Sequence, residues 1–130
     1  MRKHIPLQDL EVYKLARELS KIAWEIYQDL DWRDKKTMGD QFLESTDSTG
    51  GNIAEGYGRF HYLDRIKFYY NSRGSLNESN NHWIELLNER GKVNLEKYKH
   101  YKTIAEKLLV KLNRFISSAY KTKNIAREIH

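Results

Sequence analysis

Apolar residues recur at alternating intervals of three and four along most of this chain. That spacing lines one face of an α-helix, whereas a half-buried strand needs an interval of two. The 130 residues include a single proline, and the stretches between the apolar patterns are short. The sequence therefore predicts an all-α fold, an antiparallel up-down-up-down four-helix bundle.

The first two helices have recognisable capping residues. Apolar positions from Val12 to Leu30 predict the first helix, and Asp9 is its expected N-cap. Thr37 with Asp40 resembles a capping box that starts the second helix. A mixed apolar row is expected along one side of that helix and consists of Phe42, Thr46, Thr49, Ile53, Tyr57 and Phe60.

The third and fourth helices complete a single domain over residues 1–120. The third is expected over roughly 62–89, followed by Gly91 as a left-handed C′ residue. Its expected buried residues include Leu63, Ile66, Tyr70, Leu76, Trp83, Ile84 and Leu87. Asn94 should cap the fourth helix, which keeps a heptad of apolar residues, and 121–130 should form a frayed, basic C-terminal tail.

Composition excludes several classes of protein. The chain has no cysteine, so it can form neither disulfides nor thiolate metal sites. Its longest apolar runs are only a few residues, so we expect no membrane span, and no secretory signal is recognisable. A cytoplasmic location is the resulting expectation.

The sequence offers no candidate catalytic or metal-binding residues. Di-metal sites in helical bundles use Glu-x-x-His motifs on two helices, and this chain contains none. His82 has Glu78 and Glu85 nearby in sequence, which leaves one histidine among solvated neighbours. We therefore expect no enzymatic activity, no metal and no cofactor.

Two blocks of sequence are unusual for helices. Residues 52–59 read Asn-Ile-Ala-Glu-Gly-Tyr-Gly-Arg, and residues 74–78 read Gly-Ser-Leu-Asn-Glu. Glycine inside a helix costs about 1 kcal/mol relative to alanine, so we expect close packing of another backbone at Gly56 and Gly74.

A polar row on the second helix admits two interpretations. Asn52, Glu55 and Arg59 share one side of the helix, and Glu78 on the third helix is expected within reach of Asn52 or Arg59. The row either fixes helix register or forms a subunit interface, or it binds a small ligand. We favour the structural or interface role.

Basic residues concentrate near the C-terminus. Residues 92–130 contain 10 Lys and Arg against 3 Asp and Glu, although the whole chain carries only +5. The candidate nucleic-acid contacts on the fourth helix are Lys99, Lys102, Lys107, Lys111, Arg114 and Lys121. Lysine and arginine at helical-turn spacing can follow a phosphate backbone without reading its sequence. The alternative is that they only solvate an exposed helix face.

The chain resembles the proteins encoded in intervening sequences of bacterial 23S rRNA genes, historically labelled ribosomal proteins. The resemblance covers Leu10 to about Ala119 and rests on the Leu-Glu-Val-Tyr-Lys-Leu-Ala opening from Leu10, Gln41, Asp47-Ser48 and both blocks above. It implies a left-handed bundle, assembly into a ring that is commonly a homopentamer, no enzymatic activity, and binding of structured RNA or nucleoprotein. The accessory variability protein of diversity-generating retroelements is a relative of the same fold.

The sequence departs from this family at one informative place. Many members carry basic residues after the glutamine of the second helix, where this chain has Leu43 and Glu44. Its basic character lies instead on the fourth helix. We therefore expect an oligomeric bundle that binds RNA through that helix, and the alternative is a structural or protein-interaction adaptor without a nucleic-acid ligand.

Overall fold

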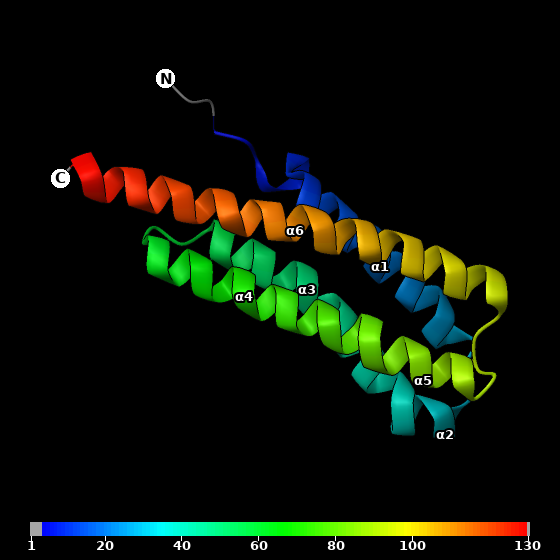
Figure 1. Ribbon diagram of the computed structural model, residues 1–130. Coiled ribbons are helices and arrows are strands. Elements are labelled where there is room, and N and C mark those ends of the chain that lie inside the picture. The colour runs from blue at the N-terminus through cyan, green and yellow to red at the C-terminus, as the bar shows by residue number, and fades with distance from the viewer. Residues whose placement is uncertain (1–3, 130) are drawn as a thin grey trace.

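Four long helical segments form the bundle seen in the computed structural model (Figure 1). The structure describes residues 4–129 and the side chains of residues 4–121, and it contains no strand within that range. The helices are α1 (Glu11–Gln28), α2 (Trp32–Asp34), α3 (Asp40–Tyr57), α4 (Tyr62–Glu78), α5 (Ile84–Glu89) and α6 (Leu95–Ile129). A 3-10 turn (Leu7–Asp9) precedes α1, and π-helical turns (Lys35–Gly39 and Ser79–Trp83) join α2 to α3 and α4 to α5.

The four segments pack around a square. Helix α1 lies against α3 and α6, and α4 closes the square by packing on the same two helices. The colours of Figure 1 show the chain reversing direction at each of its three connections. The all-α four-helix fold is confirmed, whereas the handedness of the bundle stays a prediction.

The predicted starts of the first two helices are wrong. Asp9 lies in the 3-10 turn, and Leu10 is the N-cap of α1 without a side-chain capping bond. The second segment begins earlier than expected, because Asp31 Oδ1 accepts a hydrogen bond of 2.8 Å from the Asp34 N–H and caps α2. Thr37 is inside the helical segment, where its hydroxyl donates to the Arg33 carbonyl.

The predicted boundaries of the last two segments are confirmed. Helical structure covers 62–89, and Gly91 has φ 67°, as a left-handed C′ residue requires. Asn94 Oδ1 accepts a 2.8 Å hydrogen bond from the Lys97 N–H and caps α6. The backbone of α6 is helical to Ile129, so the fraying expected over 121–130 is not seen among the described residues.

The core follows the predicted apolar faces except near the α3–α4 turn. Phe60 and Leu63 are exposed there, at 87% and 64%, because they lie where the chain leaves one helix and enters the next. Tyr70 was expected in the core, but Tyr69 is buried instead and Tyr70 is exposed. Tyr69 continues the inward face of Ile66 at an interval of three, whereas Tyr70 is rotated away from it.

A layer of buried polar residues crosses the middle of the bundle. The Thr46 and Tyr101 hydroxyls lie 2.7 Å apart and join α3 to α6. Ser72 Oγ donates to the Thr49 carbonyl at 2.7 Å and joins α4 to α3. Burial raises the pKa of Tyr101 to about 12. These bonds set the register of the helices, because a buried hydroxyl shifted along its neighbour loses its partner.

No described helix combines the length and apolar character needed to cross a membrane.

Candidate nucleic-acid interface

The outward face of α6 carries four of the six predicted basic residues. The apolar heptad of α6 packs against the core. The opposite face of the helix is exposed and carries Lys99, Lys107, Arg114 and Lys121. Consecutive members are seven or eight residues apart, about 10–12 Å along a helix, so they stay on one side. None of the four forms an ion pair with a described carboxylate. We call these four residues the outer basic row.

The other two predicted residues hold the bundle together. Lys102 Nζ lies 2.9 Å from Glu85 Oε1 and donates to the Asn80 carbonyl at 2.8 Å. Lys111 Nζ lies 3.4 Å from Glu11 Oε1 on α1. Both lysines flank the core side of α6 rather than its outward face. The structure therefore does not bring all six residues together as one binding surface.

Glu85 binds two side chains of α6, Tyr98 and Lys102. Tyr98 donates to Glu85 Oε1 at 2.7 Å, and that hydrogen bond raises the pKa of Tyr98 to about 12. Partial burial raises the pKa of Glu85, but hydrogen bonds from Lys102 and Tyr98 outweigh it and leave that pKa lowered. The lowered pKa favours the ionised carboxylate, which pairs with Lys102 and occupies its charge.

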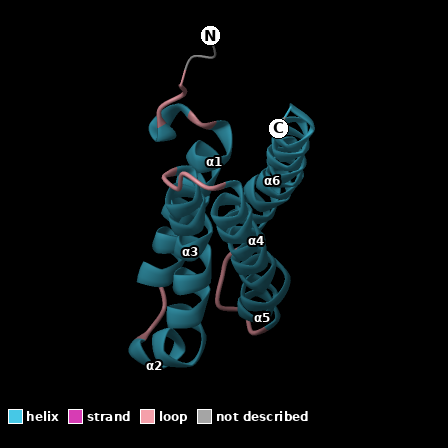
Figure 2. Ribbon diagram, turned by 90° about the vertical axis from the view of Figure 1, so that its left-hand side faces the viewer, coloured by secondary structure: helices cyan, strands magenta, loops and turns pink. Residues whose placement is uncertain are grey.

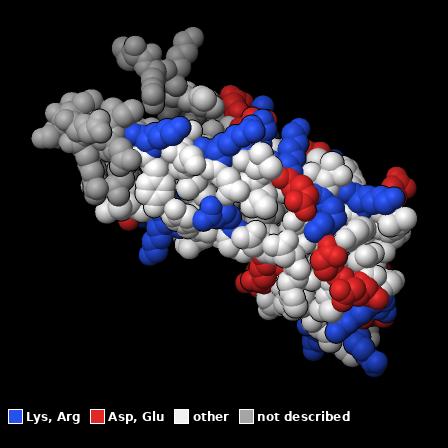
Figure 3. Space-filling view, viewed as in Figure 1, with Lys and Arg blue, Asp and Glu red and all other residues white. Residues whose placement is uncertain are grey.

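The surface around α6 combines charges of both signs. Figure 3 shows Lys and Arg gathered along α6, with acidic residues between them. The basic surface continues onto α4, where Arg73 donates to Asn113 Oδ1 of α6 at 3.0 Å and stacks over Tyr70. The sequence reasoning missed Arg73, because the segment 59–91 is nearly neutral when its charges are summed.

The predicted polar row does not form a network. Arg59 pairs with Glu55 at 3.1 Å, and both side chains are exposed. Asn52 Nδ2 donates to the Ser48 carbonyl of its own helix at 2.9 Å. Glu78 accepts from Trp83 Nε1 at 2.7 Å, so the expected contact with Asn52 or Arg59 is wrong.

The register of α4 against α3 explains why Glu78 does not contact Asn52 or Arg59. Ser72 lies opposite Thr49, and Arg65 donates to the Arg59 carbonyl. The two helices are therefore antiparallel, and higher residue numbers on α4 lie opposite lower residue numbers on α3. Glu78 is six residues beyond Ser72, about 9 Å further from Arg59 along the helix. The sequence could supply the residue types but not this register.

The two glycines expected at close helix contacts differ. A Cβ on Gly56 would lie 2.7 Å from Tyr69 Cε1 and 2.9 Å from Phe68 Cβ, so α4 packs directly on this glycine. A Cβ on Gly74 would meet nothing within 4 Å, so close packing at Gly74 is wrong. Gly74 is exposed on the outer side of α4.

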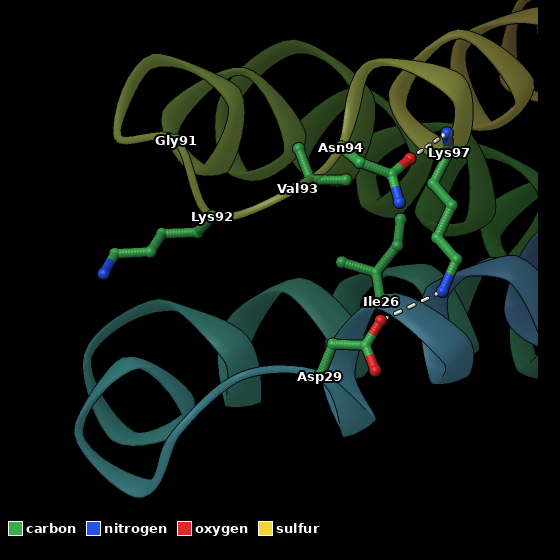
Figure 4. Close-up of a pocket in the computed structure, with 7 residues that line it drawn as sticks. All are labelled: Ile26, Asp29, Gly91, Lys92, Val93, Asn94 and Lys97. Carbon is green, nitrogen blue, oxygen red and sulfur yellow. Dashed lines mark hydrogen bonds and ion pairs between the residues drawn. The ribbon is translucent and has the colours of Figure 1, made fainter.

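A hollow of about 240 Å³ lies at the N-terminal end of α6, beside the α5–α6 connection (Figure 4). Lys97 Nζ spans it to reach Asp29 Oδ2 at 3.0 Å, while Lys92 points away and pairs with Asp34. Its charged groups already have partners, so the hollow is a structural joint. Among the described residues, no three His, Asp or Glu side chains are grouped to hold a metal ion.

Comparison with known proteins agrees with this architecture. The family model described as 23S rRNA-intervening sequence protein matches residues 8–114. A crystal structure of an S23 ribosomal protein family member of unknown function from Bacteroides thetaiotaomicron VPI-5482 is similar, with a TM-score of 0.75 and 24% identity. That match covers 82% of this chain and 96% of the other. Curated proteins give no match. Neither similarity indicates an enzyme family, and the extent of the first shows that this chain belongs to the 23S rRNA-intervening sequence protein family.

Proposed function

We propose that the protein is a non-enzymatic bundle that binds structured RNA through the outer basic row of α6. The observation that carries this proposal is the exposure of Lys99, Lys107, Arg114 and Lys121 without carboxylate partners among the described side chains. Membership of a family named for an rRNA intervening sequence supports RNA as the polyanion.

The mechanism is electrostatic and independent of base sequence. Each cation that neutralises a phosphate releases condensed counterions, so affinity falls with salt in proportion to the number of contacts. Because the outer basic row stays on one side of α6 at intervals of about 10–12 Å, it can follow one backbone over several nucleotides. Lys102 and Lys111 contribute little, since binding a phosphate would first break their ion pairs.

Charge reversal of the outer basic row tests the proposal. The variant Lys107→Glu with Arg114→Glu should weaken binding to a structured rRNA fragment about tenfold or more and reduce the salt slope by about two. Fluorescence anisotropy at several salt concentrations measures both quantities. Both residues are exposed, so the thermal stability of the variant should match that of the wild type.

A matched control separates the effect of charges on α6 from the effect of the protein's net charge. Lys14 and Lys21 are exposed on α1, and Lys14→Glu with Lys21→Glu changes the net charge by the same amount. This control should retain more affinity and a steeper salt slope than the α6 variant. Equal losses in the two variants would mean generic basicity, and unchanged binding in the α6 variant would remove α6 from consideration.

The second candidate function is a protein-interaction adaptor. Phe60 and Leu63 are both largely exposed at the α3–α4 turn, which favours contact with another protein surface. Self-association, as a ring of five in the resemblance noted above, belongs to either proposal. Light scattering on the purified protein tests it, and a monomer at micromolar concentration would exclude a stable ring.

A further inference from the structure

At one end of the bundle, α6 extends beyond α1. Helix α1 begins at Glu11, and Glu11 already pairs with Lys111, so α6 continues for many residues past the start of α1. Figure 2 shows this C-terminal part of α6 standing apart from α1. At this end the inward faces of α3, α4 and α6 meet without a fourth α-helix among the described residues, and the segment before α1 reaches α3 at Tyr57.

A cavity of about 210 Å³ occupies that position. Its lining includes Tyr57 of α3, Tyr62, Arg65 and Tyr69 of α4, and Phe115 and Ala119 of α6. Four of these six side chains are aromatic. The hollows on the outer side of α3 are larger, at about 360 and 390 Å³, but glycine and alanine account for much of their lining.

Two polar groups of this cavity are available to a ligand. Tyr69 is 2% exposed as a whole, and its hydroxyl makes no hydrogen bond with a described residue but keeps contact with solvent at the cavity. Arg65 donates through Nε to the Arg59 carbonyl, which leaves its terminal guanidinium nitrogens for an acceptor in the cavity.

The aromatic walls are rigidly placed. The rings of Tyr69 and Phe115 pack with centroids 4.8 Å apart, and Gly56 lies directly beneath the Tyr69 ring. The Tyr57 hydroxyl donates to the Ile5 carbonyl, which fixes that ring from the other side. These contacts hold two of the aromatic walls in place before a ligand binds.

We propose that this cavity binds one unpaired nucleobase of the RNA. The aromatic rings supply stacking or edge contacts, the Tyr69 hydroxyl supplies a hydrogen bond, and Arg65 supplies a donor to the base or its phosphate. The cavity is smaller than the 300–1,000 Å³ or so of drug-sized pockets, which suits a single planar group. This inference rests on the proposed function, since the outer basic row passes the same end of the bundle.

Filling the cavity tests the proposal without changing charge. The probes are an RNA hairpin with an unpaired loop and a fully paired duplex of equal length, both at near-physiological salt. One stacked base should give the wild type about a tenfold preference for the hairpin. Ala119→Phe places a ring in the cavity and should abolish that preference while leaving duplex affinity and its salt slope unchanged.

Two further variants guard the interpretation. Val110 is exposed on the same helix and away from the cavity, so Val110→Phe adds a larger side chain there and should keep the preference. Arg65→Gln should reduce the preference at least threefold, and it covers the case in which Ala119→Phe fails to fold. Melting followed by circular dichroism establishes folding for each variant.

The outcomes separate the two proposals. A wild type that binds hairpin and duplex equally overturns the nucleobase site while RNA binding stands. A preference that survives in both Ala119→Phe and Arg65→Gln also overturns it. If the wild type binds neither RNA at near-physiological salt, both the proposed function and the nucleobase site are overturned.

Discussion

The inner and outer faces of α3 both carry polar residues, and these have different roles. On the inner face, Thr46 and Thr49 are buried and hydrogen-bonded to α6 and α4. On the outer face, Glu55 pairs with Arg59 just beyond the end of the helix, both side chains are exposed, and the Arg59 guanidinium also lies over the Phe68 ring. Position around the helix, rather than polarity, decides which polar residues determine the fold.

This difference has an energetic basis. A buried hydroxyl that loses its partner costs about 1–3 kcal/mol, whereas an exposed i,i+4 ion pair is worth a few tenths. Glycines follow the same division, because Gly56 faces α4 and Gly51 faces outward from the same helix. Substitutions that act on one face should therefore barely affect the other.

The largest expected effect is at Gly56. Even a Cβ there would lie 2.7 Å from Tyr69 Cε1, so Gly56→Val must displace the Tyr69 ring from Phe115. We expect the free energy of unfolding to fall by about 3 kcal/mol, measured by urea denaturation. Gly51→Val is the matched control and should lie within about 0.5 kcal/mol of the wild type. Equal losses in the two variants would contradict the division between faces.

The inner face should also respond to alkaline pH. Because burial raises the pKa of Tyr101 to about 12, the folded state keeps a proton that the unfolded state loses above about pH 10. Stability from this group is complete below pH 10 and falls as pH rises toward 12. From pH 10 to 11 the loss should be about 1 kcal/mol for Tyr101 alone.

Comparison with Tyr101→Phe isolates this contribution. The variant loses the contact with Thr46, so it starts less stable, but its stability should fall less steeply above pH 10. Some alkaline sensitivity remains, because burial also raises the pKa of Tyr69 to about 12. Chemical denaturation at pH 9, 10 and 11 measures the slopes. Identical slopes in variant and wild type would exclude Tyr101 as the source.

Periodicity was sufficient to predict the fold, because apolar spacing reports directly on which face of a helix is buried. It predicted the third and fourth helices and the caps at Gly91 and Asn94. It missed the start at Asp31, since the charged run 31–36 contains no apolar rhythm to indicate a helix. Near the α3–α4 turn it also placed Phe60 inside, because periodicity does not mark where a helix ends.

The candidate site was harder to predict than the fold. Composition located the basic helix, but separating Lys107 from Lys111 requires knowing that Glu11 of α1 lies opposite Lys111. The aromatic cavity could not be derived at all, because it depends on the unequal lengths of α1 and α6. Which residues of two helices face each other, and where each helix ends, depend on how the whole bundle packs. Short-range sequence patterns do not predict them.

The smallest expected effect is at Gly51, and it bears most directly on the outer face. A Cβ at Gly51 meets nothing within 4 Å, so Gly51→Ala should raise the free energy of unfolding by about 0.5–1 kcal/mol through helix propensity alone. Urea denaturation measures the gain, and light scattering follows assembly in the same samples. A loss of stability or of assembly would show that another chain packs on Gly51. The outer face of α3 would then be an interface, and its polar residues would have a structural role that the single chain does not reveal.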